Sequence, residues 1–418
     1  MSVRSPFIHF LAVSLLAVGI TGTAAAQGST IAMPADAGRG AYLVLAANCI
    51  SCHTTSSGKA YAGGKAFETG FRFLGKIYSS NITPDRQTGI GAWSEADFVR
   101  AMREGIAPGG THLFPAFPYT AFTKLETADI KAIFAYLRTV PAVRADVPAA
   151  SFWFRQRWAM ALWNTLFLTP GALSAKPDQS AQWNRGFYLV ESLGHCGACH
   201  TPRNALLAER TELQLTGGVM VSEVEPGKNR SWSAPNLTGA HSGLATWSVE
   251  DLKKYLKAGF SRRAGVLGPM NEVVANSLHY LSDSDVAAIA VYLKSLPANG
   301  ESAQQSLSGA EQASGHAVYE KYCDECHLSS GRGGFRKAPP VAGSPLVQAG
   351  SAASLVNVIL FGATPAAGLP ASLDVWESMA GFKDKLSDQQ VADLSNFLRS
   401  SWENRGDTVR AKFVAEQR

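Results

Sequence analysis

The six cysteines of this 418-residue chain fall into three pairs of identical spacing, and a histidine follows each pair directly. The three stretches are NCISCH at 48–53, HCGACH at 195–200 and YCDECH at 322–327. A structural zinc site needs four ligands, usually from two such pairs close in sequence, but these pairs lie more than a hundred residues apart. A redox-active cysteine pair is typical of a strand–helix context without a trailing histidine, which the flanking sequences do not provide.

Cysteines in this pattern can attach a haem covalently, because C-x-x-C-H is the signature of c-type haem binding. The two thiols add to the haem vinyl groups, and the adjacent histidine becomes the proximal ligand of the iron. The motifs use every cysteine, so no thiol remains for a disulfide. The sequence therefore predicts three covalently bound c-type haems. The predicted attachment residues are Cys49, Cys52, Cys196, Cys199, Cys323 and Cys326, and the predicted proximal ligands are His53, His200 and His327.

The three motifs lie in similar surroundings, which indicates an internal repeat. Upstream of each motif a glycine and an aromatic residue begin a short helix, as in RGAYLVLAANC from Arg39. Downstream, each repeat ends with an amphipathic closing helix, as in LSDSDVAAIAVYLKSLP ending at Pro297. We expect the glycine to allow the upstream helix to cross the closing helix closely, with an aromatic residue of the closing helix packed at the crossing. Those aromatic residues are Tyr136, Tyr292 and Phe397, and the expected helix caps are Thr127, Ser282 and Ser387.

The fold class predicted from this repeat is all-α, with three tandem cytochrome c-like domains joined by linkers. Their predicted boundaries are residues 35–147, 181–299 and 311–404. A tryptophan-rich amphipathic connector covers residues 148–180, and a polar linker, NGESAQQSLSGA, separates the second domain from the third. The first two domains are more similar to each other than to the third, because SSNITPDRQTGIGAW at 79–93 matches APNLTGAHSGLATW at 234–247.

Methionine is the usual second axial ligand of the iron where a high reduction potential is required. Met270 lies between the predicted middle and closing helices of the second domain, and Met379 lies just before the closing helix of the third. We expect both to bind iron. In the first domain the corresponding segment, HLFPAFPYTAF, carries Phe117. Met102, His112 and an open iron site remain the alternatives there.

The first 26 residues have the three parts of a secretory signal peptide. A basic start, MSVRSP, precedes an apolar core, FIHFLAVSLLAVGITG, and the small residues of TAAAQ. A membrane anchor is the alternative, but this apolar stretch is short for a helix that spans a bilayer. We expect cleavage of residues 1–26 and a mature protein on the periplasmic side of the cytoplasmic membrane. The formal charge of +5 is too diffuse to indicate nucleic-acid binding.

The connector offers a means of peripheral membrane attachment. SFWFRQRWAMALWNTLFLTPGAL at 151–173 contains three tryptophans and two arginines near its start. That composition is typical of a helix lying in the membrane interface. A helix buried between domains has the same composition, so both interpretations remain open.

Several stretches resemble one protein family over nearly all of the mature chain. They are YSSNITPDRQTGIGAWSEADF, HLFPAFPY, CGACHTPRN, GPMNEVV and LSDSDVAAIAVYLKSLP. These stretches are similar to the tri-haem cytochrome c subunits of membrane-bound periplasmic dehydrogenases that oxidise alcohols, aldehydes, gluconate, fructose or sorbitol. Many members carry methionine where this chain has Phe117. The phenylalanine form is similar to subunits that serve molybdenum-containing enzymes oxidising aldehydes or heterocycles.

The resemblance implies an electron-transfer subunit without a substrate-oxidising site of its own. A separate catalytic subunit with a flavin, quinone or molybdenum cofactor would oxidise the substrate. Electrons would then pass through three haems to ubiquinone or a terminal oxidase of the respiratory chain. Two other functions remain as alternatives: a haem enzyme acting at an open iron in the first domain, and a soluble periplasmic electron shuttle.

Overall fold

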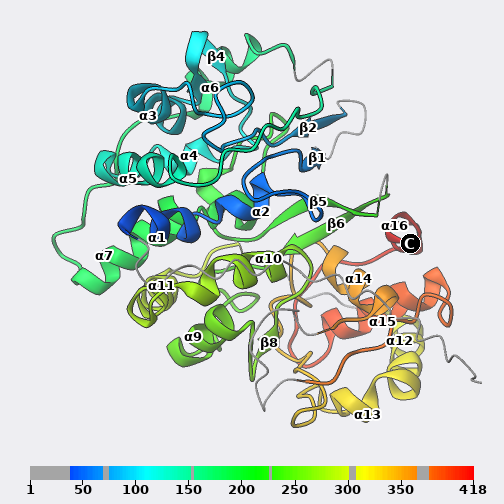
Figure 1. Ribbon diagram of the computed structural model, residues 1–418. Helices are drawn as coiled ribbons and strands as arrows, with labels where there is room; N and C mark the ends of the chain where they lie inside the picture. The colour runs from blue at the N-terminus through cyan, green and yellow to red at the C-terminus, as the bar shows by residue number, and fades with distance from the viewer. Residues whose placement is uncertain (1–37, 69–74, 152–154, 226–227, 301–306, 365–375) are drawn as a thin grey trace, which may run out of the picture.

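The computed structural model describes residues 38–68, 75–151, 155–225, 228–300, 307–364 and 376–418. The predicted signal peptide, residues 1–26, lies outside the described residues, as does Trp153 of the connector. We call the segments around the three motifs unit 1 (residues 38–147), unit 2 (181–300) and unit 3 (307–418). Unit 1 is stacked on unit 2, and unit 3 lies beside unit 2 (Figure 1).

The described helices and strands follow the order of the repeat. Unit 1 contains α1 (Arg39–Ala46), α2 (Cys49–His53), β1 (Ala66–Glu68), β2 (Lys76–Tyr78), α3 (Glu95–Glu104), β3 (Ile106–Ala107), β4 (Thr111–His112), α4 (Tyr119–Phe122) and α5 (Thr127–Leu137). The connector contains α6 (Ala159–Phe167). Unit 2 contains α7 (Ala181–Tyr188), a π-helical turn η4 (Leu189–Leu193), α8 (Gly197–His200), β5 (Gly218–Glu225), β6 (Lys228–Ala234), α9 (Val249–Ala258), β7 (Phe260–Ser261), β8 (Ala264–Gly265), α10 (Pro269–Asn276) and α11 (Asp283–Ser295). Unit 3 contains α12 (Gly309–Tyr322), α13 (Asp324–His327), α14 (Ala353–Phe361), α15 (Asp388–Ser400) and α16 (Ala411–Gln417).

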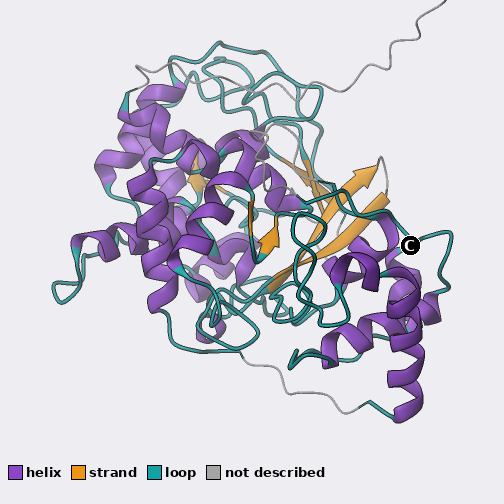
Figure 2. Ribbon diagram, turned by 90° about the horizontal axis from the view of Figure 1, so that it is seen from below, coloured by secondary structure: helices purple, strands orange, loops and turns teal. Residues whose placement is uncertain are grey.

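Helices predominate in the described residues, but the predicted all-α class omitted four two-stranded antiparallel sheets. The longest of those described is the β5–β6 hairpin, whose strand pairing begins with Gly218 opposite Ala234. This hairpin contacts β1 of unit 1 and α14 of unit 3, and Figure 2 shows its long strands beside the helices of unit 3. Within the described ranges, no helix combines the length and the apolar character needed to cross a bilayer.

In each unit the upstream helix crosses the closing helix at a glycine, which confirms the prediction. A Cβ atom added to Gly40, Gly186 or Gly315 would lie 2.2, 2.0 or 2.4 Å from a backbone oxygen of the closing helix. The same added atoms would lie within 2.8 Å of the Cβ atoms of Tyr136, Tyr292 and Phe397. Only glycine fits this crossing, which positions each motif because the motif follows the upstream helix.

Two of the three expected caps of the closing helices are present. Ser282 and Ser387 each accept a backbone N–H bond in the first turn, from Asp285 and Gln390. The prediction for Thr127 is wrong, because the residue before α5 is Glu126 and its side chain makes no cap bond. The Thr127 hydroxyl instead accepts a 2.8 Å hydrogen bond from Arg103 Nη2.

Units 1 and 2 share one hydrophobic core. A continuous buried cluster includes Leu43 and Ile133 of unit 1 together with Leu193 and Ile289 of unit 2. Unit 3 has its own cluster, and its last helix, α16, packs against α15. The three repeats are therefore not equivalent in their packing: the first two form a pair, and the third is attached to that pair.

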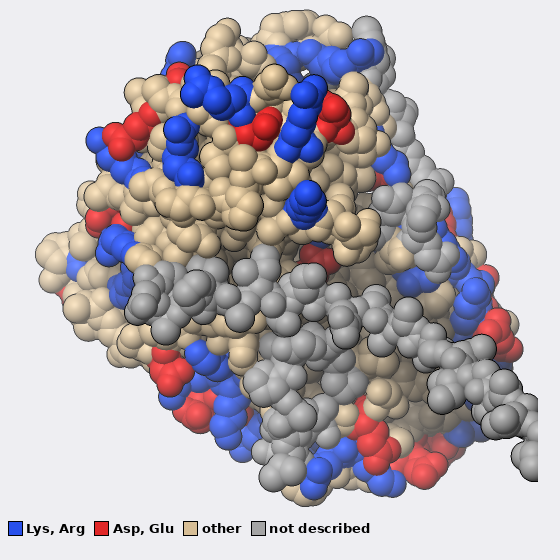
Figure 3. Space-filling view, in the orientation of Figure 1, with Lys and Arg blue, Asp and Glu red and all other residues tan. Residues whose placement is uncertain are grey.

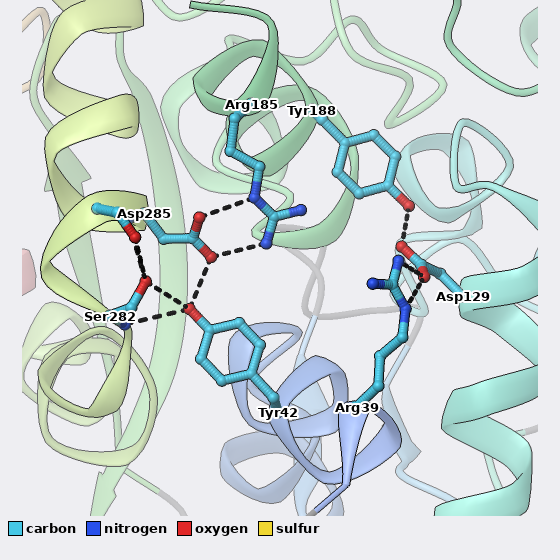
Figure 4. Close-up of polar contacts among 8 residues, drawn as sticks. Arg39, Tyr42, Asp129, Arg185, Tyr188, Ser282 and Asp285 are labelled. Atoms are coloured by element: carbon cyan, nitrogen blue, oxygen red, sulfur yellow. Dashed lines mark hydrogen bonds and ion pairs between the residues drawn. The ribbon is translucent and has the colours of Figure 1, made fainter. Parts of the chain in front are cut away.

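A reciprocal set of hydrogen bonds joins units 1 and 2 (Figure 4). The Asp129 carboxylate of unit 1 accepts from Arg39 of its own unit and, at 2.7 Å, from the Tyr188 hydroxyl of unit 2. Each of these residues has a counterpart at the matching position of the other unit: the counterparts of Arg39, Asp129 and Tyr188 are Arg185, Asp285 and Tyr42.

The second half of this set reverses the roles of the units. Asp285 of unit 2 accepts from Arg185 of its own unit at 2.7 and 2.6 Å, and from the Tyr42 hydroxyl of unit 1 at 2.6 Å. Burial alone would raise the pKa of Asp285, but the hydrogen bonds from Arg185 and Tyr42 outweigh it and lower that pKa. The stabilisation is therefore present at neutral pH and is lost as the pH falls through the lowered value.

The glycine crossing predicts a large effect of one methyl group. In Gly186→Ala the new Cβ atom would lie 2.0 Å from the Ala288 carbonyl oxygen, so the two helices must move apart. We expect the free energy of unfolding to fall by about 3 kcal/mol, measured by urea denaturation followed by circular dichroism. The matched control is Gly309→Ala in the first turn of α12, where an added Cβ atom meets nothing within 4 Å. Equal stability of the two variants would contradict this account of the crossing.

Candidate functional site

Each Cys-x-x-Cys-His motif forms a short helical turn at the end of its upstream helix. The turns of units 1, 2 and 3 are α2, α8 and α13. All six cysteines are half-buried and none forms a disulfide. Burial raises the pKa of Cys49 and of Cys196 to about 12, so these thiols are neutral. Unpaired thiols on one turn are what thioether attachment requires.

The three motif histidines share one hydrogen-bonding arrangement. Nδ1 of His53, His200 and His327 lies 2.7, 2.8 and 2.9 Å from a backbone carbonyl oxygen. The carbonyl holds the proton on Nδ1, which leaves the lone pair of Nε2 available to bind a metal. Burial also lowers the pKa of each imidazole, which favours the neutral form that binds metal. The residues of all three motifs therefore fit a haem whose iron is bound by histidine.

The accepting carbonyls are positioned by a turn that repeats in units 1 and 2. The carbonyls belong to Ser80 and Pro235, and an asparagine follows each of them. The side-chain oxygens of Asn81 and Asn236 accept the N–H of the threonine two residues on, at 2.9 and 2.8 Å. Their amide groups donate to backbone oxygens that follow the closing helices, at 2.7 and 2.8 Å.

The structure aligns Phe117 of unit 1 with Met270 of unit 2. Helices α3 and α9 both end at a left-handed glycine, Gly105 and Gly259, followed by a short hairpin. The glycine carbonyl accepts from Leu113 N–H at 2.7 Å in unit 1 and from Val266 N–H at 2.8 Å in unit 2. Four residues after these donors stand Phe117 and Met270.

The surroundings of these two residues differ. The Phe117 ring packs against the rings of Phe122 and Tyr119, with centroids 5.4 and 6.2 Å away. Met270 is the second residue of α10 and lies two residues after Gly268, whose φ is +53°. The indole of Trp232 on β6 occupies the space where a Cβ atom of Gly268 would lie. Nothing local in the sequence indicates that Trp232 lies against Gly268, because more than 30 residues separate them.

The other two candidates in unit 1 are Met102 and His112. Met102 is 4% exposed and belongs to the shared core, at the place of Leu256 in unit 2. His112 lies on β4, and its Nδ1 atom is buried without a hydrogen-bond partner in the described residues. Neither aligns with Met270.

Met379 of unit 3 lies beside the end of α14. Its backbone N–H and carbonyl pair with Ala363 at 2.8 and 3.0 Å, directly after Gly362, whose φ is +78°. A left-handed glycine also precedes the segment that carries Met270 in unit 2. The residues between Ala363 and Met379 include 365–375, which lie outside the described residues.

The motifs of units 1 and 2 both lie at the interface between these two units. Asn276, at the end of α10 in unit 2, donates to the hydroxyl of Ser51 inside the unit 1 motif at 3.0 Å. In return, His195 beside the unit 2 motif places Nε2 3.2 Å from the Ala47 carbonyl oxygen. The His195 ring also packs edge-on against Phe122 of unit 1 at 5.4 Å. Each motif thus contacts the other unit.

Two family models match the chain. The model described as cytochrome c matches residues 37–141, and the model described as cytochrome C oxidase, cbb3-type, subunit III matches residues 310–398. These matches cover the first and third motifs with their closing helices.

Several curated proteins are similar to the chain. One of the subunits of nicotinate dehydrogenase from Pseudomonas putida is 44% identical over 86% of this chain, which spans only 30% of that protein's length. The cytochrome c subunit of alcohol dehydrogenase (quinone) of Gluconobacter oxydans is 36% identical over 97% of this chain and 86% of its own length. The gluconate 2-dehydrogenase cytochrome c subunit of Pantoea cypripedii is 37% identical over 91% of this chain and 89% of its own length. The chain therefore belongs to the family of cytochrome c subunits of dehydrogenases, whose cytochrome c domains carry covalently bound c-type haem.

Proposed function

We propose that the chain is a tri-haem electron-transfer subunit, with one haem attached at each motif. The observation that carries this proposal is the arrangement common to all three motifs: two unpaired thiols and an imidazole whose Nδ1 faces a backbone carbonyl. A bound haem supplies one-electron oxidation and reduction. The chain's own residues attach it and hold the imidazole in one tautomer.

We further propose that the partner is the catalytic subunit of a dehydrogenase, from which electrons pass to ubiquinone or a terminal oxidase. The relatives named as cytochrome subunits of alcohol and gluconate dehydrogenases support such a partner. Among substrate classes we favour an aldehyde or a nitrogen heterocycle. Two features support this choice: the 44% identity to one of the nicotinate dehydrogenase subunits and the phenylalanine at position 117.

Purification with the partner tests this function. The full-length chain, affinity-tagged and purified from membranes, is expected to bring a larger catalytic subunit, identified by mass spectrometry. Adding nicotinate or an aldehyde should reduce the haems only when that subunit is present, as read from the haem absorption. A lone chain that reduces peroxide would instead support the haem enzyme, and a lone chain without turnover would support the shuttle.

We propose that α6 attaches the exported protein to the membrane surface. One face of α6 is packed on the protein: Trp163 is buried and its indole N–H donates to the Leu206 carbonyl at 2.9 Å. The opposite face presents Trp158, Leu162 and Leu166, which are 74, 62 and 60% exposed. These three residues are spaced four apart and so form one apolar stripe. Such a stripe suits a helix lying in the membrane interface, with the rest of α6 fixed to the protein.

Replacing the exposed leucines tests this attachment. In the variant Leu162→Gln/Leu166→Gln, the fraction of the chain that sediments with protein-free anionic vesicles should fall at least tenfold, because burial of each leucine contributes roughly 1.5–3 kcal/mol. The matched control is Phe335→Gln, which removes an 87% exposed apolar side chain from unit 3. Unchanged sedimentation of the double variant, or an equal loss in the control, would contradict attachment through α6.

Phe117 leads to a prediction about the haem of unit 1. We propose that its iron lacks a methionine ligand, whereas Met270 and Met379 bind iron in units 2 and 3. In Phe117→Met the number of methionine-bound irons should rise by one, measured by the long-wavelength absorption of methionine-ligated ferric haem at equal haem content. Ala116→Met, which changes the exposed neighbouring residue, should leave that absorption unchanged. No rise in Phe117→Met would overturn this assignment.

A further inference from the structure

The upstream segment of unit 2 contains one residue more than that of unit 1. From the crossing glycine to the first motif cysteine, the interval runs from Gly40 to Cys49 in unit 1 and from Gly186 to Cys196 in unit 2. The structure accommodates the additional residue in the π-helical turn η4, where Gly194 N–H donates to the Leu189 carbonyl at 2.7 Å. A π turn of this kind is frequent at functional sites.

The π turn buries a carboxylate just upstream of the motif. Glu191 is 8% exposed. Its Oε1 accepts from the Tyr292 hydroxyl on α11 at 2.8 Å, and its Oε2 accepts from the Gln214 side chain. Lys124 of unit 1 places Nζ 3.5 Å from the same Oε2. The side chain is therefore held by the closing helix of its own unit, by the segment before β5 and by the neighbouring unit.

The corresponding places in the other units carry no buried carboxylate. Five residues after the crossing glycine, unit 1 has Leu45 and unit 3 has the exposed Glu320. Glu191 lies near the attachment site, because the Cys196 N–H donates to the carbonyl of Val190, the residue directly before Glu191, at 3.2 Å.

We propose that the Glu191 carboxylate lowers the reduction potential of the haem attached at the unit 2 motif. This inference rests on the proposed function, because it requires a haem at that motif. The oxidised iron carries one more positive charge than the reduced iron, which forms when one electron arrives from a donor. A nearby buried negative charge therefore stabilises the oxidised state, and this effect is stronger in the protein interior than in water. The Lys124 side chain is 33% exposed, so water screens its opposing charge more than that of Glu191.

The test is a spectroelectrochemical titration of the full-length haem-bound protein with small redox mediators. In Glu191→Gln, which keeps the shape and removes the charge, one of the three components should become easier to reduce. We expect the equilibrium constant for its reduction to rise at least threefold, where tenfold corresponds to 59 mV for one electron. The matched control is Glu212→Gln, an exposed carboxylate of the same unit paired with Arg210, which should change no component more than twofold.

Two further variants separate charge from packing. Lys124→Met removes the positive neighbour and should shift the same component in the opposite direction, towards harder reduction. Tyr292→Phe leaves the carboxylate in place and should not make that component easier to reduce. A shift in the same direction in all three variants would show a packing effect and overturn the proposal.

Failure of this inference is distinguishable from failure of the proposed function. If the purified chain contains three haems and none changes its potential in Glu191→Gln, Glu191 does not act as proposed and the tri-haem function stands. If the unit 2 motif carries no covalently bound haem, the proposed function itself fails.

Discussion

The hydrogen bond from each motif imidazole to a backbone carbonyl is the interaction on which the arrangement of the site depends. The carbonyl belongs to a loop, and in every unit a second hydrogen bond fixes that loop to the segment after the closing helix. In units 1 and 2 the loop supplies the asparagine amide, from Asn81 and Asn236. In unit 3 the direction is reversed, and Asn404 after α15 donates to the Val341 carbonyl at 3.0 Å. The segment that follows the closing helix thus helps to position the motif histidine of the same unit, although more than 70 residues separate the two in sequence.

The units are joined by two different kinds of contact. Units 1 and 2 share a hydrophobic core, and in each unit a tyrosine hydroxyl donates a hydrogen bond to an aspartate of the other unit. Each of these aspartates is also paired with an arginine of its own unit. Unit 3 is attached by backbone and serine hydrogen bonds between β6 and α14, at Ser233 and Ser354, with distances of 2.9–3.1 Å. The space-filling view in Figure 3 shows acidic and basic side chains interspersed over this face, in keeping with the mild net charge. Units 1 and 2 are therefore joined by a common core, whereas unit 3 keeps a core of its own.

Local sequence patterns predicted much of the fold. Motif spacing located the three motif turns, helical periodicity located the closing helices, and the glycine–aromatic pattern gave their crossing, as at Gly186 and Tyr292. The alignment of Phe117 with Met270 also followed from the repeat. These features depend on neighbours in sequence or on a pattern that occurs three times, so a single chain reveals them.

The features that the sequence did not predict depend on contacts between distant segments. Nothing local indicates that Tyr42 binds an aspartate of the other unit, or that β5 and β6 form a hairpin between units. Glu191 stands in an ordinary helical pattern, and only the one-residue difference between repeats signals the π turn that buries it. The connector allowed two interpretations because its helix has both a packed face at Trp163 and an exposed one at Leu162.

The most direct test of the account is the mass of the exported chain, purified and fully denatured, so that only covalently attached groups remain. The account predicts a mass that exceeds that of the processed polypeptide by three haems, together with haem-dependent staining of the denatured band. A mass equal to that of the polypeptide alone, or with fewer than three added haems, would contradict it.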